Sequence, residues 1–438
     1  MKATVERLKG SRIRLDLEVD PDRVEQALER AYRRVVRRID VPGFRKGRAP
    51  RPIVERQIGA GALLREALDE LIPVAVGEAV REAELEPLEQ PNVDVKPFER
   101  GKPLSLTAEL TVKPAVELGQ YRGLTAVRRI ERVSDSQIDQ ALERIRERAA
   151  ELVEADHDAV AEGDFAVIDF EGFVDGQPFR GGAARGETVR VGSGRFVPGF
   201  EEQLIGLKKG EQRRIEVTFP SDFRNPELAG RAATFKVTLH AIKVQRLPAL
   251  DDEFAASVSE CETIADLRRK IREDLEREAA RRADEAVQLE LARQAARGAT
   301  IEVPEVLVER EIDEMLIGLA RDLAARGQSL DDVLNRTGEG LAELRQRMRP
   351  NAEERVRIDL VLEAIGRAEG IAPTEAELQA EINRLVETAE DRRAARAQME
   401  APERREAVRR TLMMRRALQL LVDTAQLSDE WVDPAPGD

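Results

Sequence analysis

The sequence predicts a multidomain α+β protein: an α+β N-terminal domain, an inserted β-sheet and helix domain, and an all-α C-terminal body. With 438 residues, the chain is too long for one hydrophobic core and indicates about three domains. Charged residues make up 36% and aromatic residues only 3%, a composition typical of long helices with polar outer faces. Most phenylalanines and many glycines fall within 163–244, where short alternating segments predict strands. We expect domains at 1–115 and 151–246, a linker and helix at 116–150, and a helical body at 247–438.

Composition also excludes several classes of site. The single cysteine, Cys261, cannot form an internal disulfide, and the two histidines, His157 and His240, are far apart in the sequence. We therefore expect no metal and no cofactor, and no Walker-type phosphate loop is present in the sequence. No apolar run approaches the roughly 18 residues that span a bilayer, and the N-terminus lacks the apolar core of a signal peptide. We expect a cytoplasmic protein that does not enter membranes.

The first hundred residues alternate between strand and helix patterns. Apolar residues alternate on both sides of a turn at Gly10–Ser11, which predicts a β-hairpin. Pro21 then opens an amphipathic helix, and further helices are predicted near 53–58 and 63–83. Alternating segments near 93–95 and 104–112 return to strands. This order predicts an α+β domain.

This domain contains one strongly basic segment. Residues 30–51 contain nine basic residues and a single acid, although the whole chain has a formal net charge of -14. A basic cluster in an acidic chain favours a phosphate-binding surface; the plainer alternative is a solvated helix face that ends in an ordinary turn. Proline and glycine on both sides constrain the turn, so Phe44, Arg45 and Lys46 are expected to be displayed at its tip.

The turn carries the sequence G-F-R-K-G-R-A-P at 43–50. It resembles the G-F-R-x-G-K-x-P signature of the trigger factor family, the ribosome-associated chaperones of bacteria. Arg48 departs from the signature, since the family usually has Lys there, which keeps the charge and changes the donor geometry. The resemblance implies that Phe44, Arg45 and Lys46 bind the large ribosomal subunit beside the polypeptide exit tunnel.

The pattern of residues 116–150 predicts an extended segment followed by one helix. Ser134 and Gln137 form a capping-box pattern, and Ile138, Leu142 and Ile145 make one apolar stripe. A lone helix of this length is marginal in water, so we expect it to pack on a part of the chain that is distant in sequence.

The segment 163–244 predicts a small sheet curled over one short helix that opens at Pro198. Four of its pieces resemble the FKBP-type peptidyl-prolyl isomerases in order and spacing. They are I-D-F-E-G at 168–172, D-G-Q-P-F at 175–179, V-G-S-G-R-F-V-P-G-F-E at 191–201 and F-P-S-D-F at 219–223.

This second resemblance implies a catalytic pocket for proline-containing peptides. Its lining residues would be Phe170, Phe179, Phe196, Val197, Phe200, Phe223 and Phe235. The plain alternative is that these residues only form the core of a small barrel. Arg180 stands where the family tends to carry a carboxylate, which leads us to expect a modest enzyme. Rotation about an X-Pro bond has a barrier of about 20 kcal/mol, and a dry aromatic pocket that favours the twisted amide needs no nucleophile or metal.

Beyond residue 247 the pattern is helical. Capping signals and helix breakers predict five helices, at about 264–298, 304–327 and 341–370, then one that begins at 374 and one at 402–421, with a kink at Pro350 and a loose tail after Trp431. The side chains of Met413, Met414, Leu420 and Leu421 either frame a concave, adaptable surface or are buried in a plain bundle.

Together the two resemblances imply an ATP-independent, ribosome-associated chaperone that binds nascent or unfolded polypeptides at the exit tunnel and catalyses prolyl isomerisation. A homodimer off the ribosome and roles in cell division and protein transport are implied by the resemblance. The alternative function is a stand-alone FKBP-type prolyl isomerase whose helices serve only as a scaffold.

Overall fold

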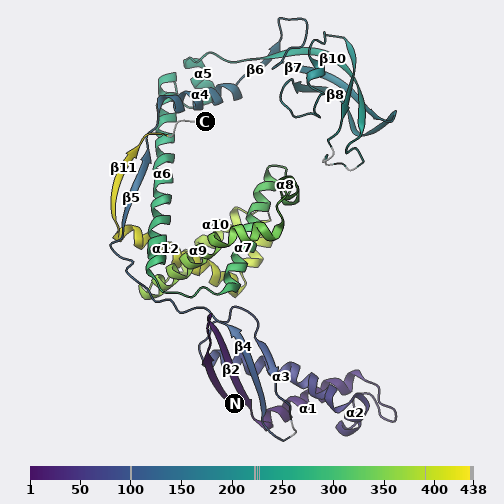
Figure 1. Ribbon diagram of the computed structural model, residues 1–438, viewed down its shortest axis with the longest axis vertical. Coiled ribbons are helices and arrows are strands. Elements are labelled where there is room, and N and C mark those ends of the chain that lie inside the picture. Colours follow the sequence, from purple (N-terminus) through teal and green to yellow (C-terminus); the bar gives the residue numbers. More distant parts are fainter. Residues whose placement is uncertain (99–100, 221–222, 224, 226, 390, 435–438) are drawn as a thin grey trace. The chain divides into compact units, whose positions relative to one another are not determined.

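The computed structural model describes residues 1–98, 101–220, 223, 225, 227–389 and 391–434. The chain forms two compact units (Figure 1). The first combines Met1–Arg128 with Asp284–Asp429, and the second combines Arg129–Ala283 with the last residues from Glu430. Each unit contains both helices and strands, which confirms the predicted multidomain α+β class. None of the described helices is long and apolar enough to cross a bilayer.

The N-terminal part of the first unit is a four-stranded antiparallel sheet with strand order β1-β2-β4-β3, packed against helices. Its elements are β1 (Lys2–Arg7), β2 (Arg12–Val19), α1 (Pro21–Arg38), α2 (Arg51–Ile58), α3 (Ala60–Glu82), β3 (Asn92–Val95) and β4 (Leu104–Thr111). β1 and β2 form the predicted hairpin, and alternate residues of β2 from Ile13 to Val19 are buried in the core.

The basic face of α1 differs from the sequence prediction. Arg30 and Arg34 both pair with Glu70 of α3, the first at 2.9 Å, and Arg34 and Arg38 reach Glu66 of the same helix at 3.5 and 3.8 Å. The basic face is therefore partly neutralised by α3, which the sequence pattern did not indicate. The reason is tertiary: α3 supplies carboxylates that lie more than 25 residues away in the sequence.

The C-terminal part of the first unit is a helical bundle. Its helices are the end of α6 (Ile264–Gly298), α7 (Glu305–Ala325), α8 (Leu330–Thr337), α9 (Leu341–Ala368), α10 (Glu375–Glu387), α11 (Arg392–Met399) and α12 (Pro402–Thr424). The core joins α6, α9 and α12, with Leu291, Ile365 and Leu421 fully buried. Met414 and Leu420 pack half-buried against this core, and Met413 lies so close to Gly366 that a Cβ there would be 2.6 Å from its Cγ. Leu421 is therefore buried as the bundle alternative expects, whereas the other three side chains are only half-buried.

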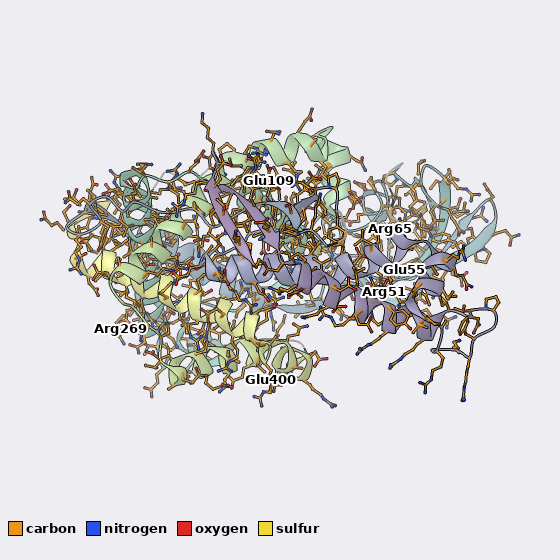
Figure 2. The ribbon with its side chains drawn as sticks, turned by 90° about the horizontal axis from the view of Figure 1, so that it is seen from below. Arg51, Glu55, Arg65, Glu109, Arg269 and Glu400 are labelled. Atoms are coloured by element: carbon orange, nitrogen blue, oxygen red, sulfur yellow. The ribbon has the colours of Figure 1, made fainter. Side chains whose placement is uncertain are left out.

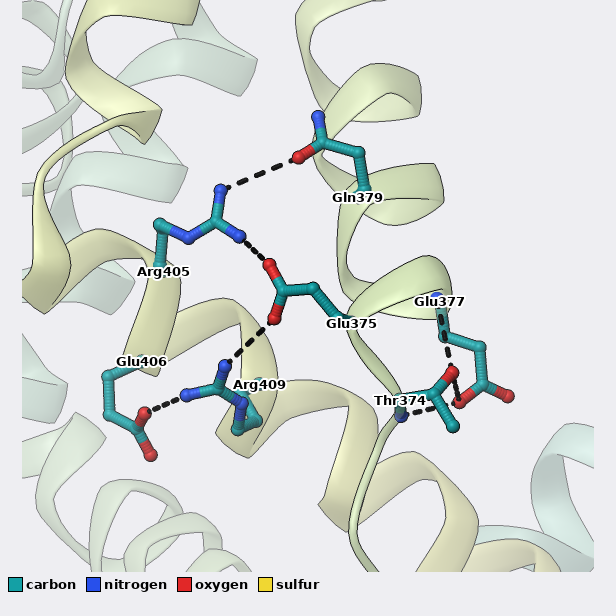
Figure 3. Close-up of polar contacts among 7 residues, drawn as sticks. All are labelled: Thr374, Glu375, Glu377, Gln379, Arg405, Glu406 and Arg409. Atoms are coloured by element: carbon teal, nitrogen blue, oxygen red, sulfur yellow. Dashed lines mark hydrogen bonds and ion pairs between the residues drawn. The ribbon is translucent and has the colours of Figure 1, made fainter.

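Ion pairs fasten α10 to α12 (Figure 3). Thr374 caps α10 through a capping box with Glu377. Glu375, in the first turn, accepts hydrogen bonds from Arg409 at 3.3 Å and from Arg405 of α12. These exposed pairs set the register of the two helices and contribute little stability each.

Beyond residue 247 the sequence did not predict α5 (Asp252–Val258), α8, α11 or β11 (Gln426–Val432). β11 pairs with β5 (Thr125–Glu131) in a two-stranded sheet, and Trp431 at its end is 55% exposed. β11 extends one residue past Trp431, where the predicted loose tail begins, and residues 435–438 of that tail lie outside the described residues.

In the second unit, the predicted lone helix finds its distant partner. α4 (Asp135–Arg148) begins with the predicted capping box, in which the amide of Gln137 donates to Ser134 at 3.3 Å. Its residues Ile138 and Leu142 are buried against α5 (Asp252–Val258) and the start of α6. This confirms that the helix packs on residues about 120 positions further along the chain.

The rest of the second unit is a five-stranded antiparallel sheet with strand order β6-β10-β7-β8, in which β9 pairs with β10. Its strands are β6 (Glu151–Glu154), β7 (Phe165–Val174), β8 (Gln177–Arg190), β9 (Gln212–Thr218) and β10 (Ala232–Arg246). The predicted helix at Pro198 is shorter than expected, a 3-10 turn over Glu202–Leu204. Gly199 has φ of +86°, which a right-handed helix cannot include, so the helix starts after it.

Candidate functional site

The first candidate site is an aromatic cluster on one face of the β7–β10 sheet. Period-two alternation places Phe170 of β7 and Phe235 of β10 on the face that also carries the buried residues Ile168 and Val237. The 191–201 loop brings Phe196 and Phe200 over the same face. Residues from distant parts of the chain thus converge on one apolar surface.

Ring contacts join these residues. The ring of Phe170 meets the rings of Phe196, Phe200 and Phe235 edge-on at centroid distances of 6.1, 6.0 and 6.0 Å. Phe196 stacks on Phe200 at 5.1 Å with an interplanar angle of 15°. These are favourable geometries for aromatic pairs.

A second group of rings extends the cluster. Phe179 of β8 contacts Phe235 at 6.0 Å and Phe219 at 5.9 Å, and Phe219 contacts Phe223 at 4.5 Å. Phe219 was missed as a site residue, although it opens the quoted F-P-S-D-F motif; residues 221 and 222 of that motif lie outside the described residues. Val197 packs half-buried against the same core. The structure thus brings all seven predicted pocket residues into one cluster.

The members of this cluster differ in burial. Phe200 and Phe235 are 1% and 6% exposed, so they form a floor that belongs to the domain core. The other five are half-buried, with surface left for a ligand. The core and pocket interpretations are therefore compatible: the two buried rings support the sheet, and the five half-buried side chains leave apolar surface available to a proline ring.

Two glycines that the sequence analysis did not assign make room for the rings. A Cβ on Gly172 would lie 2.6 Å from the ring of Phe235 and 2.8 Å from that of Phe179, and one on Gly182 would lie 2.8 Å from Phe179. Any side chain at these positions would displace the ring of Phe179. The position of Gly172 at the end of the I-D-F-E-G motif is a sequence signal that could have identified it as a residue of the site. Arg180, by contrast, is exposed on β8.

The second candidate site is the 43–50 turn. Its base is a small core of Val36, Val41, Ala49 and Val54, and the Tyr32 hydroxyl donates to the Ala49 carbonyl at 2.7 Å. Within the turn, backbone amides of residues 44, 47 and 48 donate to carbonyls of residues 41, 36 and 45 at 2.9–3.1 Å. The turn is therefore braced, while the side chain of Phe44 stays 43% exposed at its tip.

Charge is concentrated at this tip. Arg45, Lys46 and Arg48 are exposed, and the nearest acid to Lys46 is the exposed Asp40, 3.9 Å away. At the start of α2, Arg51 donates a hydrogen bond to Glu55 of the same helix at 2.7 Å (Figure 2). Arginines of α1 likewise donate to carboxylates, in their case those of α3. The exposed cations of the tip, together with the exposed Arg37 in the last turn of α1, are therefore the ones best placed to meet an anionic partner.

Comparison with known proteins matches three family models to this chain. Residues 1–145 match the family model for the N-terminal part of bacterial trigger factor, residues 157–240 match that for FKBP-type peptidyl-prolyl cis-trans isomerase, and residues 263–423 match that for the trigger factor C-terminus. A trigger factor from Pelotomaculum thermopropionicum is 41% identical over 431 residues, which cover 98% of each chain. The chain belongs to the trigger factor family. Another trigger factor, from Geobacillus sp. (strain WCH70), is 46% identical over 88% of this chain and 90% of its own.

Solved structures agree at the level of the fold. A structure from a study of promiscuous substrate recognition by the trigger factor chaperone matches 97% of this chain and 99% of its own, with a TM-score of 0.55 and 21% identity. Like other trigger factors, the protein is a chaperone with an FKBP-type peptidyl-prolyl isomerase domain, so it is an enzyme as well as a binding protein.

Proposed function

We propose that this trigger factor docks on the large ribosomal subunit beside the exit tunnel, shields nascent or unfolded polypeptides there without ATP, and speeds their slow prolyl steps. It works in the cytoplasm and forms a homodimer when off the ribosome. Its parts are a docking domain at 1–115, a linker and helix at 116–150, an isomerase domain at 151–246 and a chaperone body at 247–438. The observation that carries the proposal is the braced turn, whose tip exposes an aromatic ring and three cations, joined to an isomerase fold in one chain.

The tip suits a ribosomal partner for two reasons. Its cations can neutralise phosphates of ribosomal RNA or acidic groups of a ribosomal protein, and this attraction acts at long range. The ring of Phe44 then offers one apolar anchor of the kind that dominates binding energy at interfaces. Because the turn is already hydrogen-bonded to α1, little ordering is needed on binding.

The isomerase chemistry follows from the pocket. The transition state of X-Pro rotation is a twisted amide that has lost conjugation and therefore needs less solvation by water. The half-buried rings of Phe170, Phe179 and Phe196 can enclose the proline ring and exclude water, which favours this state over the planar amide. No proton transfer is required. The residues we assign to catalysis are those of the predicted set: Phe170, Phe179, Phe196, Val197, Phe200, Phe223 and Phe235.

For polypeptide shielding we assign the α7–α8 end of the bundle. α7 buries only Val308 and Ile312, both near its beginning, and no residue of α8 is fully buried. Beyond them α7 carries apolar side chains that are half-buried or exposed, among them Met315, Leu319, Leu323 and the 52% exposed Ile317. A flexible, shallow apolar surface of this kind suits weak binding to many unfolded chains.

A triple substitution tests this surface. We expect Met315→Ser, Ile317→Ser and Leu323→Ser together to raise the concentration needed for half-suppression of aggregation at least about tenfold, since each covered apolar side chain contributes about 1–2 kcal/mol. The measurement is light scattering of a denatured client protein after dilution.

A matched control replaces three apolar residues that are similarly or more exposed but scattered. Val74→Ser, Val127→Ser and Leu289→Ser alter side chains that are 48%, 48% and 45% exposed. This variant should suppress aggregation as the parent chain does. Equal losses in both variants would show that the α7–α8 end is not a particular binding surface.

A further inference from the structure

A buried carboxylate lies beside the aromatic pocket. Glu201 directly follows Phe200 and is only 3% exposed, the lowest value of any charged side chain among the described residues. An ionised group in such a place is costly unless donors surround it. Its neighbour Glu202, by contrast, is exposed.

The donors all come from one short loop. The Oε1 atom of Glu201 accepts hydrogen bonds from the amides of Arg195 and Phe196 at 2.9 and 3.0 Å and from the Ser193 hydroxyl at 3.0 Å. The Oε2 atom accepts one from the amide of Gly194 at 3.0 Å. Three successive amides therefore point at a single carboxylate, a concave anion-binding arrangement of backbone groups.

These hydrogen bonds decide the charge of Glu201. Burial by itself raises its pKa, but the amides of Phe196 and Gly194 and the other donors outweigh burial, so the pKa lies below its ordinary value of 4.5. A depressed pKa in the folded state means that the carboxylate stabilises the fold above its unfolded pKa, and that this contribution is lost as pH falls through the folded value. At neutral pH the group is ionised and its four hydrogen bonds are charge-assisted.

The loop so anchored carries one wall of the pocket. The amide of Phe196 is held by Glu201, while its ring stacks on Phe200, the residue just before Glu201. The amide of Phe200 in turn donates to the carbonyl of Val197 at 3.0 Å. The loop is thus held in place both by backbone hydrogen bonds and by the stacking of the Phe196 ring on Phe200.

We propose that Glu201 is a positioning residue of the isomerase: by accepting hydrogen bonds from the amides of residues 194–196, it fixes Phe196 and Val197 over Phe200 and so shapes the wall against which the prolyl ring is held. This inference rests on the proposed role of the pocket. Glu201 itself has no open surface toward a substrate and acts only through the loop.

The first test is Glu201→Gln in the full-length chain. Glutamine keeps the size, but it removes the charge and turns an NH₂ group toward backbone donors. We expect kcat/KM for an X-Pro peptide to fall about tenfold, the effect of weakening charge-assisted hydrogen bonds. Glu201→Asp should recover part of the loss because it keeps the charge. Glu202→Gln, the same change one residue along on an exposed side chain, should leave kcat/KM unchanged.

A double-mutant cycle separates positioning from general stability. If Glu201 acts through Phe196, Glu201→Gln should cost little further activity in a Phe196→Ala background. An undiminished tenfold loss in that background would overturn the inference, as would full activity of Glu201→Gln alone. If Phe196→Ala is itself as active as the parent, the pocket assignment fails instead, and the role of Glu201 falls with it.

A milder variant covers the case in which Glu201→Gln does not fold. Ser193→Ala removes one of the four donors and leaves the carboxylate with three amides. We expect a fall in kcat/KM of about two- to threefold, which again disappears in the Phe196→Ala background. An unchanged kcat/KM in a folded Ser193→Ala chain, together with an unfolded Glu201→Gln chain, would identify Glu201 as a residue of stability only.

Discussion

Replacing Phe44, Arg45 and Lys46 together by alanine is expected to abolish co-sedimentation of this protein with ribosomes while the chain stays folded. The substitutions remove one exposed aromatic anchor and two charges from the tip of a braced turn. At about 1–2 kcal/mol for each contact, the loss exceeds a hundredfold in affinity. The fold should persist because the base of the turn, with its buried valines and the Tyr32–Ala49 hydrogen bond, is untouched.

The control for this variant lies on β1 of the same domain. Lys2, Val5 and Arg7 are exposed, and Val5 at 42% matches Phe44 at 43%. Their replacement by alanine removes the same number of cations and one apolar side chain, and binding should persist. Binding of the parent chain should weaken as salt rises, since phosphate contacts release counterions. Ribosome binding that survives the Phe44, Arg45 and Lys46 substitutions would refute the docking assignment.

The second large effect is expected at the pocket. Phe170→Ala should lower kcat/KM for an X-Pro peptide about tenfold or more, because it removes a wall ring that contacts three other rings. Phe170 is a better target than Phe200, since Phe200 is 1% exposed and its truncation would open a cavity in the core at a cost of about 3–5 kcal/mol. Phe170→Leu preserves apolar volume and should retain part of the activity.

Phe173 on the same strand provides the matched control. It lies three residues from Phe170, on the opposite face of β7, where the Lys236 ammonium sits 5.3 Å from its ring. Phe173→Ala is the same chemical change outside the cluster and should leave kcat/KM near that of the parent. Thermal unfolding of both variants gives the stability correction. If the two variants lose activity equally, the aromatic cluster is only the core of the domain.

The sequence predicted those features that depend on local pattern. Alternation predicted β2, capping pairs predicted the starts of α4 and α10, and motif spacing predicted which phenylalanines would meet. In each case the signal lies within a few residues or within a motif of known order. The predicted start of the helix at Pro198 was wrong because the sequence does not reveal that Gly199 adopts a positive φ.

Specific pairings between distant residues were not predicted. The ion pairs of the α1 arginines are not visible in the sequence because their partner Glu70 lies 36 residues beyond Arg34. β11 has no strand signal of its own, and it is extended because β5, some 300 residues earlier, offers an edge. Likewise, the roles of Gly172 and Glu201 emerge only when the ring and amide positions are known.

The central claim is that chaperone and isomerase functions reside in different parts of one chain. It is tested most directly by replacing residues 163–244 with a short Gly-Ser linker, which can bridge the gap because Lys243 pairs with Phe165 across the β10–β7 ladder. The measurement is light scattering of a refolding client at equimolar chaperone without ATP. We predict that this variant has lost prolyl isomerase activity and still suppresses aggregation. If the client scatters as much with the variant as without any chaperone, while the variant itself stays monodisperse and helical, the account is contradicted. That result would favour a stand-alone prolyl isomerase with a helical scaffold.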